Sequence, residues 1–152
     1  MRRYQSFLAW ICALFTVVLV SCGSPQAVTP TYTSEQLNML DLSAGKISAM
    51  RDRMTTELAD LLEKENWNYV DMFIHGPLGT IRQQAGKIDR NLLTKAEQKE
   101  AKEISQELFG HLESLDAAAD AGDYRQAMSD YKDSLDDIDA LLKLVPESEP
   151  TS

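Results

Sequence analysis

Apolar residues recur at intervals of three and four along four stretches of the chain, a spacing that places them on one face of an α-helix. The four expected helices cover residues 35–65, 67–93, 95–119 and 124–145. Their apolar positions are Leu37, Leu40, Ala44, Ile47, Met54, Leu58 and Leu61; Trp67, Val70, Ile74, Leu78, Ile81, Ala85, Ile88 and Leu92; Ala101, Ile104, Leu108, Leu112, Leu115 and Ala119; and Tyr124, Met128, Tyr131, Leu135, Ile138, Leu142 and Val145. The pattern predicts four amphipathic helices and offers no strand candidate.

Capping signals mark where three of these helices begin. Thr33 with Gln36 and Thr94 with Glu97 have the spacing of capping boxes. Asp123 is placed to cap the last helix. Because the connections are only one to four residues long, sequential helices should be antiparallel neighbours. The sequence therefore predicts an all-α fold, an up-down-up-down four-helix bundle.

Two places should disturb the helices. The first helix would be roughly 45 Å long, so it should overhang or bend, and Gly45 is the expected soft point. In the second helix, residues 75–79 read His-Gly-Pro-Leu-Gly. Pro77 has no N–H to donate, and its ring clashes with the carbonyl of Phe73. This segment should kink or interrupt the helix, either as a tolerated irregularity or as a shaped surface for a partner.

The N-terminus has the features of an exported lipoprotein. Two arginines precede residues 7–20, an uncharged run that suits the apolar region of a signal peptide and is shorter than a membrane span. The run ends in Leu-Val-Ser-Cys, a bacterial lipobox, which predicts lipid attachment at Cys22. The predicted division is a signal peptide over 1–21, a lipidated tether over 22–33, a bundle over 34–146 and a disordered tail over 147–152.

Cleavage after Ser21 changes both the cysteine count and the charge. Cys12 is lost with the signal peptide, so Cys22 becomes the single cysteine and no internal disulfide forms. The remaining chain has 13 basic and 24 acidic residues, a net charge of −11. Such a chain repels nucleic acid and anionic surfaces. The second expected helix is the only one with a net positive charge, +1.

The chain offers little for catalysis. It has no Ser/His/Asp constellation, glycine-rich phosphate loop, haem-attachment motif or zinc-finger spacing, and neither histidine belongs to a Glu-x-x-His di-iron motif. We therefore expect no enzyme activity, no cofactor and no dedicated metal site. Asp71 with His75, and Glu107 with His111, are spaced to share one side of a helix. Each pair is expected to form a surface hydrogen bond or weak ion pair, with weak zinc binding as the alternative.

Several segments together resemble the cyanobacterial PsbQ (CyanoQ) family. They are the lipobox and tether, Trp67, the segment Ile-His-Gly-Pro-Leu-Gly at residues 74–79 with Arg82, and the segment Leu-Phe-Gly-His-Leu-Glu-Ser-Leu-Asp-Ala-Ala at residues 108–118. The resemblance spans almost all of the chain after the signal peptide. A lipobox replaces the proline-rich N-terminal arm of the plant proteins, so the resemblance implies nothing about the mode of N-terminal binding.

The resemblance implies a four-helix extrinsic subunit of photosystem II, lipid-anchored on the lumenal side of the thylakoid membrane. It implies that the protein helps retain the calcium and chloride of the oxygen-evolving centre and supports the assembled complex without chemistry of its own. The implied partners are the manganese-stabilising protein and lumenal loops of a core antenna protein. A generic envelope lipoprotein that binds a protein partner, and a metal-carrying bundle, remain the alternatives.

The interrupted second helix is the expected docking surface. It combines the helix-breaking segment, the net positive charge and the match to the family's most specific segment. Arg82 is the first residue to test there, because a guanidinium pairs bidentately with carboxylates. The candidate partner-binding residues are Trp67, His75, Gly76, Pro77, Leu78, Gly79 and Arg82.

Overall fold

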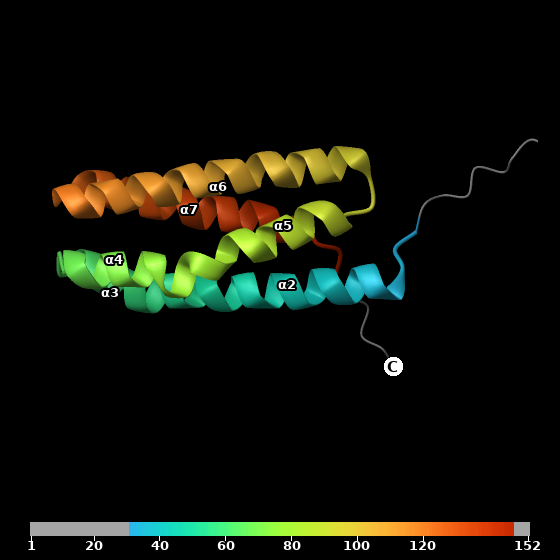
Figure 1. The fold of residues 1–152 in the computed structure, drawn as a ribbon, viewed down its shortest axis with the longest axis horizontal. Helices are drawn as coiled ribbons and strands as arrows, with labels where there is room; N and C mark the ends of the chain where they lie inside the picture. The colour runs from blue at the N-terminus through green and yellow to red at the C-terminus, as the bar shows by residue number, and fades with distance from the viewer. Residues whose placement is uncertain (1–30, 148–152) are drawn as a thin grey trace, which may run out of the picture.

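The computed structural model describes residues 31–147, which form a bundle of antiparallel helices (Figure 1). The expected all-α four-helix bundle is confirmed over these residues. The predicted signal peptide (1–21), the lipid site at Cys22, most of the tether and nearly all of the tail lie outside the described residues. Among the described helices, none is both long enough and apolar enough to cross a bilayer.

The first arm of the bundle consists of α2 (Ser34–Arg53), a single π-helical stretch η2 (Met54–Leu58) and α3 (Ala59–Glu63). It begins at the expected capping box. The side chain of Thr33 accepts a hydrogen bond from the backbone N–H of Gln36, whose own side chain accepts one from the backbone N–H of Thr33. The helix therefore starts within one residue of the predicted position.

The irregularity in the first arm lies at η2, so the expectation of a soft point at Gly45 is wrong. Gly45 sits inside regular α2. The hydroxyls of Thr55 and Thr56 both donate to the carbonyl oxygen of Asp52, at 2.9 and 2.8 Å. Such side-chain bonds compete with backbone N–H groups for the same carbonyl and loosen the helical turn. The loosened turn is therefore accompanied by hydrogen bonds from threonine hydroxyls to a backbone carbonyl, and not by a glycine.

The second arm is broken, as predicted. It consists of α4 (Trp67–His75), the short 3₁₀ helix η3 (Pro77–Thr80) and α5 (Ile81–Asn91). Gly76 has φ −92° and ψ −90° between α4 and η3. Its N–H still bonds the carbonyl of Met72 at 3.0 Å, and a Cβ on Gly76 would lie 2.7 Å from that carbonyl oxygen. Glycine is therefore required immediately before the proline.

The third and fourth arms are unbroken helices, α6 (Lys95–Ala121) and α7 (Tyr124–Lys143). The expected capping box of Thr94 opens α6, and the side chain of Asp123 accepts a hydrogen bond from the backbone N–H of Gln126 to open α7. The turn between them contains Gly122 in the left-handed conformation, with φ +67°.

Each arm packs against two neighbours. α6 lies along α7 and contacts both halves of the second arm, while α5 packs on α2 and α2 packs on α7. The chain enters α2 at the end of the bundle that also holds the α5–α6 connection; we call this the tether end (Figure 1). The hydroxyl of Tyr32 accepts a hydrogen bond from the backbone N–H of Leu93 there, at 3.2 Å. The α3–α4 and α6–α7 connections lie at the opposite, far end.

The predicted apolar stripes form the core. Leucine and isoleucine side chains from all four arms meet along the bundle axis. The largest fully buried side chains are Leu40, Ile47, Met54, Leu58, Leu62, Val70, Ile88, Leu92, Leu108, Leu115, Ile138 and Leu141. Ten of these twelve come from the predicted stripes; the exceptions are Leu62 and Leu141, since the sequence pattern assigned Leu61 and Leu142 instead. In both cases the buried residue is a direct neighbour of the assigned one.

We expect Gly122→Ala to lower the free energy of unfolding by about 1 kcal/mol, because an L residue with a Cβ is strained at positive φ. The added Cβ would meet Trp67 Nε1 at an ordinary 3.6 Å, so crowding adds little. Gly45→Ala is the matched control: it lies in a helix interior with open space around it, and should raise stability by about 0.5–1 kcal/mol. Urea unfolding followed by circular dichroism measures both. Equal effects from the two substitutions would contradict this account of the turn.

Candidate interaction site

The helix break creates a small surface pocket where α4, η3 and α5 meet α6. Its volume is about 170 Å³, and we call it the junction pocket. It brings together the two segments that were most specific in the sequence. The lining residues are Ile74, His75, Leu78, Gly79, Ile81, Arg82, Phe109, Leu112, Glu113 and Asp116. The pocket thus has an apolar floor and a rim of charged side chains.

Arg82 on the rim already has partners within the chain. Its Nη2 donates to Glu113 Oε1 on α6 at 2.9 Å, and its guanidinium lies 4.1 Å from the ring centre of Phe109. Both charged side chains remain largely exposed, 61% for Arg82 and 74% for Glu113. An exposed pair of this kind contributes at most about 1 kcal/mol to stability, so either charge remains available to a docking surface.

His75 lies between two carboxylates. Its Nε2 is 3.3 Å from Asp71 Oδ1, one turn earlier on α4, and 3.2 Å from Asp116 Oδ2 on α6. The expected pairing of His75 with Asp71 is confirmed, and Asp116 is a partner that the sequence did not reveal. The other oxygen of Asp116, Oδ1, is buried without a hydrogen-bond partner. Within the described chain, this is the one group of His, Asp and Glu side chains close enough to share a metal ion.

The other candidate binding residues differ in their exposure. Gly76 and Gly79 are exposed and Pro77 is half-buried, whereas Leu78 is only 3% exposed and anchors the segment in the core. Trp67 lies at the far end of α4, with its indole nitrogen close to Gly122 in the α6–α7 turn. The structure therefore groups His75 to Arg82 around the junction pocket but places Trp67 outside it.

His111 does not pair with Glu107, so that expectation is wrong. Its Nδ1 is 2.7 Å from Asp137 Oδ2 on α7. The hydrogen bond to Asp137 raises the pKa of His111, with smaller contributions from the charges of Asp133 and Asp130. Packing turns the imidazole toward the neighbouring helix, where the Asp137 carboxylate is only 15% exposed.

Other contacts between helices also escaped the sequence analysis. Arg51 on α2 makes a two-point contact with Asp139 on α7, including Nη2 to Oδ2 at 2.7 Å. The Arg51 guanidinium holds the pKa of Asp139 below its usual value. Asp130 is 4% exposed, and its carboxylate accepts hydrogen bonds from Ser114 at 2.7 Å and Gln126 at 3.1 Å. The residues of these contacts lie on different helices or a turn apart and form no recognisable motif.

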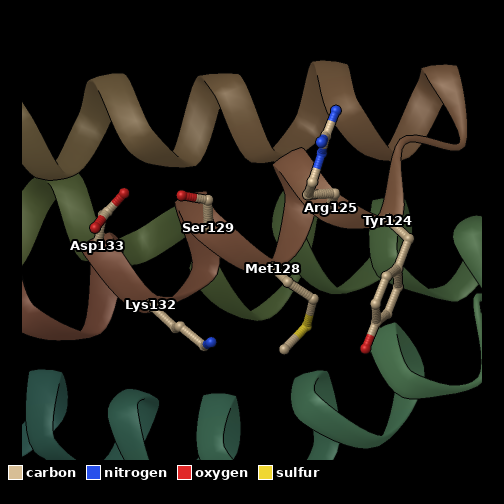
Figure 2. A pocket seen from close by; sticks show the side chains of 6 residues that line it. All are labelled: Tyr124, Arg125, Met128, Ser129, Lys132 and Asp133. Atoms are coloured by element: carbon tan, nitrogen blue, oxygen red, sulfur yellow. The ribbon is translucent and has the colours of Figure 1, made fainter.

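A second, wider groove of about 400 Å³ runs along α7 near the far end. Tyr124, Met128 and Lys132 extend from one side of α7, and Arg125 and Asp133 from the other (Figure 2). The only other lining residue is Ser129. The groove is formed by one helix surface with mixed charge, which favours a solvated face.

These features define a class of protein: a small helical bundle whose charged surface pocket suits contact with another protein. The family described as "PsbQ: Oxygen evolving enhancer protein 3" matches residues 2–146 of the chain. The protein CyanoQ of Synechocystis sp. (strain ATCC 27184 / PCC 6803 / Kazusa) is 41% identical over 149 residues, covering 97% of this chain and 99% of that protein.

The chain belongs to the PsbQ family. Members of this family are extrinsic subunits of photosystem II in the thylakoid, and this chain is one of them. The resemblance inferred from the sequence is thus confirmed, together with the general function that it implied.

The raised pKa of His111 predicts pH-dependent stability. A folded pKa above the unfolded value of about 6.5 stabilises the fold fully below that value, and the contribution is lost as pH rises through the folded pKa. We therefore expect Asp137→Asn to lower the free energy of unfolding more at about pH 5.5 than at about pH 9, by up to about 1 kcal/mol. Urea unfolding at the two pH values measures the difference.

The control for this experiment is Asp136→Asn, which removes an exposed carboxylate from the adjacent position of α7. It should lower stability little at either pH. A loss for Asp137→Asn that is the same at both pH values would show that protonated His111 contributes nothing to the fold.

Proposed function

We propose that this protein is a non-enzymatic subunit on the lumenal side of photosystem II, where it stabilises the oxygen-evolving centre and the assembled complex. The observation that carries the proposal is the family match over residues 2–146. It favours this function over that of a generic envelope lipoprotein. The proposed partners are the manganese-stabilising protein and lumenal loops of a core antenna protein.

In the proposed mechanism, the bundle covers part of the lumenal surface of photosystem II through a weak interface. The junction pocket is small, and its charged rim is already partly paired, so it does not favour tight binding of a small molecule. A lipid anchor at Cys22 would hold the bundle at high effective concentration beside its partner, and a modest interface would then suffice. A diacylglyceryl group supplies two chains, enough for stable attachment.

Metal binding is a second candidate property, favoured by the cluster of Asp71, His75 and Asp116. The potential ligand atoms of all three lie within 4.8 Å of one another. An imidazole nitrogen with carboxylate oxygens suits zinc. His75 is 64% exposed, however, and a cluster of three residues with an exposed imidazole favours weak binding over a structural metal.

The docking surface proposed here is the rim of the junction pocket, from His75 to Arg82. The second helix alone was expected to present a positive surface. The rim instead carries charges of both signs, because Glu113 and Asp116 of α6 lie against it. Arg82 and Glu113 offer a cation and an anion side by side. Such a surface fits a partner of complementary mixed charge and gives specificity more than raw affinity.

We expect Arg82→Glu to weaken association with photosystem II, by about 1 kcal/mol or less at an interface rim and by several kcal/mol if docking buries the guanidinium. The fold should stay intact, because the Arg82–Glu113 pair is exposed. The amount of protein that co-purifies with tagged photosystem II at increasing salt measures the effect. Lys46→Glu changes an exposed lysine of α2 that does not line the junction pocket, and should be nearly silent.

A charge swap separates docking from internal pairing. The double variant Arg82→Glu with Glu113→Arg restores an ion pair between α5 and α6 but exchanges the two charges. If Arg82 meets the partner, the double variant should bind as poorly as Arg82→Glu. Full recovery of binding in the double variant would mean that the pair acts only within the bundle.

The proposed anchor is tested by Cys22→Ser. This substitution removes the thiol that takes the diacylglyceryl group, so the variant should stay unprocessed or unlipidated and leave the membrane fraction more easily. Cells labelled with radioactive palmitate report the modification directly. Undiminished label in the variant would rule out lipid attachment at Cys22.

A further inference from the structure

Charge is unequally divided between the two halves of the bundle. The half at the tether end comprises residues 34–48, 86–104 and 139–147, and contains seven basic and eight acidic side chains. The far half comprises residues 49–85 and 105–138, and contains six basic and fifteen acidic side chains. The net charge is therefore −1 at the tether half and −9 at the far half.

The basic residues of the tether half are concentrated on the α5–α6 edge. Lys95, Lys99 and Lys102 are spaced by four and three residues, so they form one stripe along α6. All three are exposed; the side chain of Lys99 is 77% exposed, and its Nζ lies 3.4 Å from Glu103 Oε1. Glu97 and Glu100 also lie within this segment of α6. Arg90, on α5, is also exposed. We call the three lysines the lysine stripe.

The stripe lies where the chain leaves the bundle. Tyr32, just before α2, is hydrogen-bonded to Leu93 in the connection between α5 and α6. Lys95 follows two residues later. The segment between Cys22 and Thr33 contains ten residues, which reach at most about 35 Å when fully extended. A lipid on Cys22 would therefore attach the bundle to the bilayer through its tether end, where the lysine stripe also lies.

We propose that the lysine stripe is a lipid-contacting surface, which rests on anionic headgroups of the bilayer and orients the bundle with its far end raised. The inference rests on the proposed anchor at Cys22. Both halves contribute to the orientation, since an anionic surface attracts the lysines and repels the acidic far half. Each lysine near such a surface adds about a fivefold preference, and the neighbouring Glu97, Glu100 and Glu103 reduce the sum over the three lysines.

The sequence provides a reporter for this orientation. Trp67 is the only tryptophan after the signal peptide, and it lies at the far end beside Gly122. Cys22 is the only cysteine in the same part of the chain. A protein comprising residues 22–152, which includes the whole described bundle, can therefore be coupled through Cys22 to a maleimide lipid in vesicles. Energy transfer from Trp67 to dansyl headgroups then reports how closely the far end approaches the bilayer.

We expect transfer to be lower on vesicles of phosphatidylglycerol and phosphatidylcholine than on vesicles of phosphatidylcholine alone. Reversing the stripe, with Lys95→Glu, Lys99→Glu and Lys102→Glu together, should remove the difference between the two vesicle types. Salt near 1 M should also remove it, because the screening length falls to about 3 Å. Circular dichroism of each variant confirms that the bundle is folded.

The matched control reverses three basic residues of the far half, with Lys64→Glu, Arg125→Glu and Lys132→Glu together. It changes the net charge equally but should keep the low transfer on anionic vesicles. Equal transfer on both vesicle types for the unsubstituted protein would overturn the proposal, as would an unchanged result after stripe reversal. Chemical coupling makes the result independent of natural lipidation and of photosystem II, so it does not decide the proposed function.

Discussion

The break at Gly76–Pro77 is the constraint on which the surface of this bundle depends. Pro77 cannot donate to the carbonyl of Phe73, and no side chain fits at Gly76 because a Cβ would lie 2.7 Å from the Met72 carbonyl oxygen. The second arm therefore changes course between α4 and α5. One half packs mainly on α6 and α3, and the other on α2 and α6. The junction pocket forms where the two halves meet α6.

A strongly acidic bundle must also hold its helices together against their own repulsion. Cross-helix contacts place positive or donor groups beside carboxylates at several levels. Arg51 joins α2 to α7 through Asp139, and His111 joins α6 to α7 through Asp137. Asp130 is buried but accepts hydrogen bonds from neighbouring side chains, which offsets the cost of removing it from water. The apolar core sets the fold, and these contacts set how the helices face one another.

Sequence reasoning succeeded where the determining forces are local. Apolar periodicity located all four arms, and the spacing of Thr33 with Gln36 predicted a cap that depends on neighbouring residues alone. It failed where the outcome depends on which way a helix is rotated in the bundle. The pairing of His111 with Glu107 was reasonable from spacing, but the packing of α6 turns the ring toward α7. For the same reason, the charge of Arg82 could be read from the sequence, whereas its pairing with Glu113 could not.

The two surfaces discussed above lie on the same edge of the molecule, and this relates anchoring to docking. Arg82 precedes Arg90 by eight residues of helix, roughly 12 Å along α5. On α6, Glu113 lies farther from the tether end than the three lysines of the stripe do. If the tether half rests on the bilayer, the junction pocket stands above the headgroups and faces sideways, toward whatever projects from the same membrane. An interface in that position would need little intrinsic affinity, because the proposed anchor and orientation would already restrict both distance and direction.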